Sequence, residues 1–444
     1  SNVGGYPITA ALGSLSATNY SFSFTNGTLT VGKAPLTITA DNQTKVYGAA
    51  NPALTATITG FKNSETTAVL TGTAALSTVA ATGSGVASYA ITAALGTLAS
   101  GNYSFGLIDG TLAVTKAPLT VTADNTTRAY GAANPTFTAT LTGFVNSETL
   151  ATSGVSGAAV VTTTATLTSA AGTYPLSPAL GTLNASNYAF TTFTNGTLTI
   201  GQASQTITFG TLANKTYGAA SFTVAATASS SLTPSYSIVS GPATLSGSTV
   251  TITGAGTVVV RASQAGDANY TAATPVDQSF TVAKATLTVT ADAKSRVYGA
   301  ANPTLTATIT GYVNNETSTV ISGAAAVTTA TTTTSNVGGY TITAAVGTLS
   351  ATNYDFSFTA GTLTVSKAAL TVAAEAKSRT YGDANPTLTA TITGYVNSET
   401  SAVISGTPAL STGATATSNV GGYPITAALG TLSATNYSFG LVDG

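Results

Sequence analysis

The chain has 444 residues, of which 13 are basic and 14 acidic, and a net charge of -1. Charged side chains make up 6% of it, against about 25% in a usual soluble domain, so binding to nucleic acid or to an anionic membrane is disfavoured. Because His, Cys, Met and Trp are absent, the usual general base, the thiol nucleophile, disulfides and most transition-metal ligands are excluded. We therefore expect no enzyme, no cofactor and no metal site.

The apolar content favours a folded chain with several domains. Hydrophobic residues make up 43% of the sequence, which is enough to offset the entropy lost on ordering. A chain of this length exceeds a single hydrophobic core. No apolar run approaches the 18 residues of a membrane-spanning helix.

In chain order, residues 1–32 correspond to the C-terminal part of a truncated repeat, and the first complete repeat follows. In five segments of that repeat apolar residues alternate with Thr, a pattern that predicts half-buried antiparallel strands. These segments are residues 36–40, 54–59, 89–93, 103–105 and 111–114. Between them, Asn63, Ser64 and Glu65 offer a helix start and Gly72 a stop, so one or two helical turns are expected there.

An internal repeat organises the whole chain. The motif Tyr-Gly-Ala-Ala-Asn-Pro begins at Tyr47, Tyr130 and Tyr298, with a near copy at Tyr381 and a divergent one at Tyr217. The tyrosines of a recurrent Asn-Tyr pair are separated by 83, 85, 82, 84 and 83 residues. We expect A-type repeats at 33–115, 116–201, 284–366 and 367–444, the last lacking its final strand, and one B-type Ig-like repeat at 202–283.

The junctions between repeats contain almost no linker. Residues 28–38, Thr-Leu-Thr-Val-Gly-Lys-Ala-Pro-Leu-Thr-Ile, run from the last strand of one repeat into the first strand of the next. Such a junction bends less than a Gly/Ser tether, which predicts a semi-rigid rod. Residues 1–27 match 418–444 at 22 of 27 positions, so we expect either a segment cut from a longer array or one asymmetric unit of a fibre.

The A-type repeats resemble the MBG repeats of large bacterial surface adhesins. The resemblance rests on Lys-Ala-Pro-Leu-Thr-Val-Thr-Ala-Asp, Tyr-Gly-Ala-Ala-Asn-Pro, Thr-Gly-Phe-Val-Asn-Ser-Glu-Thr, Gly-Gly-Tyr-Pro-Ile and Asn-Tyr-Ser-Phe. The B-type repeat resembles the bacterial Ig-like repeats that are often interspersed with them. The resemblance implies an exported, mostly β segment and identifies no ligand.

The predicted fold is mainly β, a tandem array of small modules forming an elongated rod. Each module is expected to be an Ig-like β-sandwich or a β-grasp-like arrangement, because a short helix between strand pairs suits either.

Charged residues recur at fixed offsets in the A-type repeats and are candidates for inter-module contacts. We expect them to form salt bridges or hydrogen bonds at the joints and on turn backbones; a Ca²⁺ site and a Lys-Asn isopeptide bond are the alternatives. The candidates are Lys33, Asp41, Lys45, Glu65, Lys116, Asp124, Arg128, Glu148, Lys284, Asp292, Arg296, Glu316, Lys367, Glu375, Arg379 and Glu399.

The 19 tyrosines support two interpretations. Exposed rings at regular positions can stack on sugars, as in carbohydrate-binding modules. Alternatively, Tyr47 and its copies anchor a turn, while Tyr103 and its copies form a core corner with the hydroxyl bonded to backbone.

The function expected from the sequence is that of a structural spacer in the shaft of a bacterial adhesin or surface fibre, outside the cell. One alternative is a self-assembling filament built by head-to-tail or donor-strand contacts, and another is a set of glycan-binding adhesive modules. The expected partners are neighbouring repeats of the same or identical chains and, in the last case, cell-surface or matrix glycans.

Overall fold

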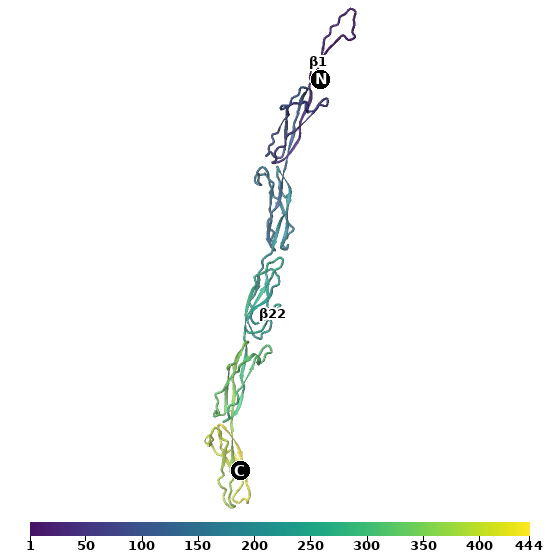
Figure 1. Cartoon of the computed structure of the whole chain (residues 1–444). Helices are drawn as coiled ribbons and strands as arrows, with labels where there is room; N and C mark the ends of the chain where they lie inside the picture. The colour runs from purple at the N-terminus through teal and green to yellow at the C-terminus, as the bar shows by residue number, and fades with distance from the viewer. The chain divides into compact units, whose positions relative to one another are not determined.

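The computed structural model describes all residues, 1–444, and contains almost no helix (Figure 1). It divides into two compact units. Unit 1 comprises Ser1–Ser204 and Asp267–Thr271, and unit 2 comprises Gln205–Gly266 and Ala272–Gly444. Each unit is described by itself. No helix in the chain is long and apolar enough to cross a membrane.

Unit 1 begins with a two-stranded antiparallel sheet and continues with two complete repeats, called repeat 1 (33–115) and repeat 2 (116–201). The opening strands are β1 (Gly4–Ile8) and β2 (Gly27–Val31). Repeat 1 contains β3 (Ala34–Ala40), β4 (Gln43–Val46), β5 (Ala56–Thr59), the 3-10 helix η1 (Thr67–Val69), β6 (Ala75–Ser77), β7 (Ser88–Ala94), β8 (Tyr103–Ile108) and β9 (Gly110–Thr115). Repeat 2 contains β10 (Ala117–Ala123), β11 (Thr126–Ala129), β12 (Ala139–Thr142), β13 (Val160–Thr162), β14 (Gly172–Ala179), β15 (Tyr188–Thr194) and β16 (Gly196–Gly201).

Unit 2 begins with the strands of the B-type repeat, and β22 is labelled in Figure 1. These strands are β17 (Ile207–Phe209), β18 (Lys215–Thr216), β19 (Phe222–Thr223), β20 (Ala226–Ala228), β21 (Ser235–Ser240), β22 (Ala243–Ser246), β23 (Thr249–Ile252), β24 (Gly256–Ser263) and β25 (Val276–Ala283). They form sheets in the orders β18-β25-β24-β21, β19-β23-β22 and β17-β20.

Two further A-type repeats complete unit 2, called repeat 3 (284–366) and repeat 4 (367–444). Repeat 3 contains β26 (Ala285–Ala291), β27 (Lys294–Val297), β28 (Ala307–Thr310), η2 (Ser318–Val320), β29 (Ile321–Ser322), β30 (Ala326–Thr328), β31 (Gly338–Ala345), β32 (Ser350–Ala351), β33 (Tyr354–Thr359) and β34 (Gly361–Ser366). Repeat 4 contains β35 (Ala368–Ala374), β36 (Ala390–Thr393), η3 (Ser401–Val403), β37 (Ala409–Thr412), β38 (Ile425–Ala428) and β39 (Tyr437–Val442).

Each complete A-type repeat is a sandwich of two sheets. In repeat 1 the sheets have the orders β5-β3-β8 and β4-β9-β7-β6. Strand β3 pairs parallel with β8, and β4 pairs parallel with β9, while the remaining pairs are antiparallel. Two residues, Asp41 and Asn42, carry the chain from β3 in the first sheet to β4 in the second. This division of the first strand between two sheets is an Ig-like arrangement.

The core forms because apolar side chains alternate with Thr along the strands, as the period-two pattern predicts. In repeat 1, Leu36 and Ile38 on β3 and Ile91 and Leu112 on the second sheet are all fully buried, at 0% exposure. The threonines between them are only partly covered. Burial of each such side chain contributes about 1.5–3 kcal/mol. The expected alternation of buried and exposed positions is therefore confirmed, whereas the expectation of antiparallel pairing is wrong for β3 with β8 and for β4 with β9, which pair parallel.

The helical segment is a single turn, within the one or two turns that the sequence predicts, but it begins later than predicted. Only Thr67–Val69 forms a 3-10 turn, with Thr66 as its N-cap. Asn63 and Ser64, which were expected to start the helix, instead have positive φ angles of 56° and 62°. Since none of the helical residues is buried, no helix packs on a sheet, and the repeat is a sandwich and not a β-grasp fold.

Consecutive repeats within a unit are joined by a single residue. Lys116 alone separates β9 from β10 in unit 1. In unit 2, Lys284 separates β25 from β26, and Lys367 separates β34 from β35. A strand that leaves one sandwich therefore enters the next without a flexible linker.

Candidate functional site: the joint between repeats

A strained turn within repeat 2 positions the side chain of Glu148. Asn146 and Ser147 both adopt left-handed backbone conformations, with φ of 55° and 60°, which is costly for residues other than Gly. The turn is closed by the Glu148 N–H, which donates to the Val145 carbonyl at 3.0 Å. The same pair of left-handed residues recurs at 63–64, 314–315 and 397–398. The turn thereby fixes the direction of the glutamate that follows it.

A tyrosine from the same repeat holds this carboxylate. Tyr188, the first residue of β15, is 1% exposed. Its hydroxyl donates to Glu148 Oε2 at 2.6 Å and accepts the Val145 N–H at 3.1 Å. The ring therefore fastens the Asn-Ser-Glu turn to the end of the sandwich.

A second tyrosine reaches the same carboxylate from the preceding repeat. The Tyr47 hydroxyl donates to Glu148 Oε1 at 2.6 Å. The two tyrosine rings meet edge to face, with centroids 5.5 Å apart and an interplanar angle of 84°, the preferred geometry of aromatic pairs. Glu148 thus links two consecutive repeats through both of its oxygens.

The glycine that follows Tyr47 is required by this contact. Gly48 has a φ of +83°, and a Cβ at this position would lie 2.4 Å from the Val145 side chain. Only a residue without a side chain lets the two backbones approach so closely. The Tyr-Gly pair of the repeated motif is therefore an element of the joint.

A backbone contact completes the joint. The Val86 N–H of repeat 1 donates to Asn187 Oδ1 of repeat 2 at 3.0 Å. Asn187 directly precedes Tyr188, so the Asn-Tyr pair supplies two neighbouring contacts. We call this set of contacts between a Tyr-Gly pair, an Asn-Ser-Glu turn and an Asn-Tyr pair the clasp.

The clasp raises the pKa of its tyrosines. The hydrogen bond to Glu148 is the main cause that raises the pKa of Tyr47, and burial is the second. For Tyr188 burial is the larger cause and Glu148 the second, and its pKa rises to about 12. A negative phenolate beside a carboxylate is unfavourable, so both hydroxyls stay protonated as hydrogen-bond donors.

Unit 2 contains two further copies of the clasp, with Asn315 in place of Ser in the first. Tyr217 and Tyr354 both donate to Glu316 at one junction, and Tyr298 and Tyr437 both donate to Glu399 at the other. Their ring centroids lie 5.6 Å apart in each case. The asparagine contacts recur as Ala255 N–H to Asn353 and Val337 N–H to Asn436, and the glycine contacts as Gly218 against Val313 and Gly299 against Val396.

Two positions in unit 1 retain only part of the clasp. Glu65 accepts from Tyr103 and from no second tyrosine, although Asn102 accepts the Val3 N–H. Tyr270 packs edge to face on Tyr130, and no carboxylate joins this pair.

The four lysines that open the A-type repeats bind within their own repeat. Lys116 Nζ, for example, donates to the Ala185 carbonyl at 2.7 Å. The corresponding bonds are Lys33 to Ser100, Lys284 to Ala351 and Lys367 to Ala434. These lysines therefore tie the first residue of a repeat to the backbone of the loop before its Asn-Tyr pair, and they make no hydrogen bond to the neighbouring repeat.

The recurrent acids after the first strand also bind inside one repeat. Asp124 accepts from the hydroxyls of Thr138 and Thr140, both at 2.6 Å, and these bonds lower its pKa. The equivalent carboxylates are Asp41, Asp292 and Glu375. They stabilise the edge of the first sheet and lie outside the joints.

The third set of charges anchors a loop within each repeat. Arg128, 8% exposed, donates to Asn134 and to the Thr166 carbonyl, and Asn134 in turn donates to the Ala165 carbonyl. Lys45, Arg296 and Arg379 have equivalent backbone partners. Their role is the expected contact with turn backbones, and of the sixteen candidates only Glu148, Glu316 and Glu399 cross a joint.

Comparison with known families identifies the repeats. The MBG domain (YGX type) matches residues 36–113, 119–199, 287–364 and 370–444, which together make up more than half of the chain. The chain belongs to the MBG domain family. The matched segments lie within the four A-type repeats and leave the B-type strands β17–β25 outside.

Other comparisons give only distant likenesses. No curated protein matches the sequence. Among solved structures, a four-domain fragment of Drosophila N-cadherin has 10% identity and a TM-score of 0.21, with 63% of this chain and 83% of that chain covered. An I-band fragment of titin has 12% identity, a TM-score of 0.23 and coverages of 56% and 96%. A fragment of the S-layer protein rSbsC has 12% identity, a TM-score of 0.18 and coverages of 90% and 64%. Likenesses this low carry no information about function.

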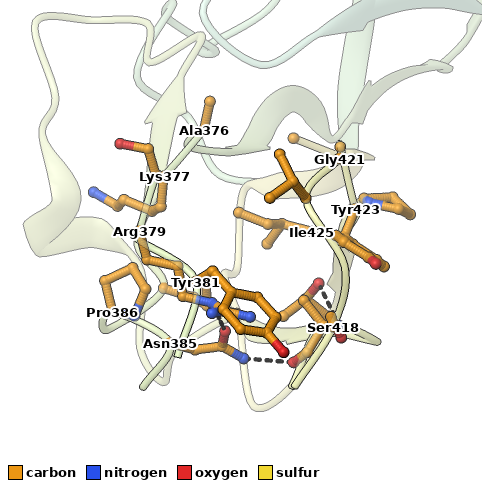
Figure 2. A pocket seen from close by; sticks show the side chains of 18 of the residues that line it. Ala376, Lys377, Arg379, Tyr381, Asn385, Pro386, Ser418, Gly421, Tyr423 and Ile425 are labelled. Atoms are coloured by element: carbon orange, nitrogen blue, oxygen red, sulfur yellow. Dashed lines mark hydrogen bonds between the residues drawn. The ribbon is translucent and has the colours of Figure 1, made fainter. Parts of the chain in front are cut away.

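The MBG repeats offer no metal cluster, since no group of three acidic side chains comes together. A groove of about 600 Å³ lies in repeat 4. Figure 2 shows Lys377 and Arg379 on one side of it and Gly421, Tyr423 and Ile425 on the other.

The groove lies at the position that a strand occupies in repeat 3. In repeat 3 the equivalent residues belong to β27 and β31, which both pair with β34. Gly444 lies at the position that Gly361, the first residue of β34, has in repeat 3. Strand donation by another chain stays a prediction.

The MBG clasp also shows what the sequence analysis missed. The backbone hydrogen bond expected for the hydroxyls of Tyr103 and its copies is present in the four A-type repeats, since each hydroxyl there accepts a backbone N–H. Their additional bond to a glutamate was not expected, because charged residues and tyrosines were considered as separate sets. The sequence signal of the clasp is that the motifs Tyr-Gly, Asn-Ser-Glu and Asn-Tyr recur together along the chain. Because the clasp buries Tyr47, Tyr188 and their counterparts to 6% exposure or less, these rings offer no face for sugar stacking.

Proposed function

We propose that this MBG array is a stiff spacer in the extracellular part of a bacterial surface protein. The observation that carries the proposal is the clasp, which fastens consecutive repeats within each unit across a junction of one residue. A linker of one residue restricts bending, and a hydrogen-bonded contact between two buried rings restricts rotation. Such a segment acts by keeping the groups at its two ends a fixed distance apart.

The chemistry of the chain supports an exposed, structural role. The clasp depends on hydrogen bonds and ring contacts, and few surface charges are available to bind ligands or to respond to salt. The chain has no Cys or Met, so it presents no sulfur to oxidants. The placement outside a bacterial cell rests on the similarity of these repeats to those of surface adhesins.

Distance measurements between spin labels on the full chain test the spacer. The chain has no cysteine, so Ser104→Cys and Thr192→Cys place one label on the exposed face of β8 and one on that of β15. We expect a narrow distance distribution in the parent chain. Glu148→Ala should broaden it, because the clasp between repeats 1 and 2 is lost.

Glu65→Ala in the same labelled chain is the matched control, because Glu65 holds one tyrosine of its own repeat and crosses no joint between complete repeats. It should leave the distribution narrow. A broad distribution in the parent chain would refute the stiff spacer.

A further inference from the structure

We propose that the three tyrosine pairs of the clasps are sites of oxidative cross-linking, at which a one-electron oxidant converts each pair into dityrosine and joins consecutive repeats covalently. The composition favours this chemistry. With no Cys, Met, Trp or His, tyrosine is the most readily oxidised side chain in the protein. The proposal goes beyond the spacer and does not depend on it.

The geometry brings the reactive parts of the two rings together. The hydroxyls of Tyr47 and Tyr188 bind the two oxygens of one carboxylate, each at 2.6 Å, so the hydroxyl ends of both rings converge. The carbons beside the hydroxyl are those that couple in dityrosine. The rings are perpendicular, and coupling requires one of them to turn about its broad χ2 torsion.

The carboxylate supplies the proton acceptor. A tyrosine that loses an electron also loses its hydroxyl proton, and a base already hydrogen-bonded to that proton makes the transfer direct. Glu148 accepts one proton and water takes the other. Burial does not prevent the step, because the electron leaves by tunnelling and the oxidant does not need to touch the ring.

The reaction balances as a two-electron oxidation. Each tyrosine gives up one electron and one proton, and the two phenoxyl radicals form a carbon–carbon bond between ring carbons adjacent to the oxygens. The hydrogen on each of these carbons then moves to the oxygen, which restores two phenols. A peroxide used through a peroxidase takes up the two electrons and two protons and is reduced to water.

The same chemistry should occur at three places and fail at two others. The pairs Tyr47–Tyr188, Tyr217–Tyr354 and Tyr298–Tyr437 share the geometry and the carboxylate. Tyr103 has Glu65 but no second tyrosine. Tyr130 and Tyr270 are as close, with centroids 5.4 Å apart, but no carboxylate accepts from either hydroxyl. These positions are natural controls within the same molecule.

The experiment is mild oxidation of the full chain with a peroxidase and hydrogen peroxide, at a protein concentration low enough to keep it monomeric. Dityrosine fluorescence in the monomer fraction reports the reaction, and tandem mass spectrometry of proteolytic peptides locates it. We expect linked peptides that join Tyr47 to Tyr188 and the two equivalent pairs, each lighter by two hydrogen atoms than the sum of its parts.

Variants at one joint isolate each contribution, with the other two joints as internal references. Tyr47→Phe should abolish only the Tyr47–Tyr188 product, whereas Tyr381→Phe, at an exposed ring outside the clasps, should change none of the three. Glu148→Gln keeps one acceptor oxygen, as an amide carbonyl, but removes the base, and should lower the yield at its joint several-fold.

Two results would overturn the proposal. One is dityrosine formed only between exposed rings such as Tyr20 and Tyr381 while the three pairs are recovered unlinked. The other is an equal yield at Tyr130–Tyr270 and an unchanged yield in Glu148→Gln, which would remove the assigned role of the carboxylate. Circular dichroism of each variant confirms that the sandwich fold is retained.

Discussion

Glu148 is the central residue of one joint, because its carboxylate accepts a hydrogen bond from a tyrosine hydroxyl of each of the two repeats. Hydrogen bonds to a charged group contribute about 1.5–3 kcal/mol each, more than an exposed ion pair, which contributes about 0–1 kcal/mol. The chain thus concentrates its few charges where they gain hydrogen bonds. Its three ion pairs lie on the surface.

A substitution at Gly48 separates the effect on stability of the contact across the joint from the effect of backbone strain. Gly48→Ala should destabilise the protein by about 1–2 kcal/mol through the left-handed backbone and by about 1–3 kcal/mol more through overlap with Val145. The matched control is Gly382→Ala, because Gly382 has a φ of +94° but no atom within 4 Å of its Cβ position. Urea unfolding of both variants measures the difference. Equal losses would show that the glycine serves only its own turn.

The carboxylates bound by threonine predict a loss of stability in acid. Hydrogen bonds from Thr389 and then Thr391, followed by Lys377, lower the pKa of Glu375 from 4.5 to about 2. Because the folded pKa is the lower one, the stabilisation is complete above the unfolded pKa and disappears as the pH falls from 4.5 towards 2.

In Glu375→Gln the free energy of unfolding, measured with urea, should therefore fall less steeply as the pH decreases from 4.5 towards 2; we call this decrease the acid limb. Lys377→Met is the comparison, since it leaves the larger threonine contributions in place and should flatten the limb less. An acid limb of unchanged slope in Glu375→Gln would contradict the assignment.

At the scale of elements, strand β34 holds the second sheet of repeat 3 together, because it pairs with β27 and β31 and buries Leu363 and Val365 to 1% exposure or less. Leu363→Asp should destabilise the protein strongly, because it would bury an unpaired charge. Urea unfolding of the full chain measures the loss.

The control is Thr364→Asp, at an exposed position of the same strand, which should change the free energy of unfolding by less than about 0.5 kcal/mol. Equal losses in the two variants would mean that burial along β34 does not hold the sheet.

At the scale of the whole chain, the small number of charges predicts insensitivity to simple salt. The Debye length falls from about 10 Å at 0.1 M to about 3 Å at 1 M ionic strength, yet only three surface ion pairs can be screened. We expect the free energy of unfolding in NaCl to change by less than about 1 kcal/mol over this range.

Sodium sulfate at the same ionic strength is the reference, because it strengthens apolar burial and should stabilise the chain where NaCl does not. A large loss of stability in NaCl would show that electrostatic contacts hold the repeats together.

The sequence alone determined the strands and the presence of a tandem repeat. Alternation of apolar residues with Thr predicted the strands correctly, because the side-chain period of a strand is two and one face is buried. The recurrence of Tyr-Gly and Asn-Tyr identified the repeats and their family resemblance. It did not decide between a sandwich and a β-grasp fold, since that depends on whether the segment after Asn63 packs as a helix.

Only the tertiary structure revealed the clasp. Tyr47 and Glu148 are 101 residues apart, and periodicity states which residues recur but not which of them meet. Their contact depends on a left-handed Asn-Ser turn and on the approach of two backbones at Gly48, and the recurrence of Asn-Ser-Glu and Tyr-Gly does not state that these two features meet. The same limit explains why the sequence did not separate the charges that cross a joint from those that bind turn backbones: side-chain contacts are set by the packing of sandwiches, which local pattern does not encode.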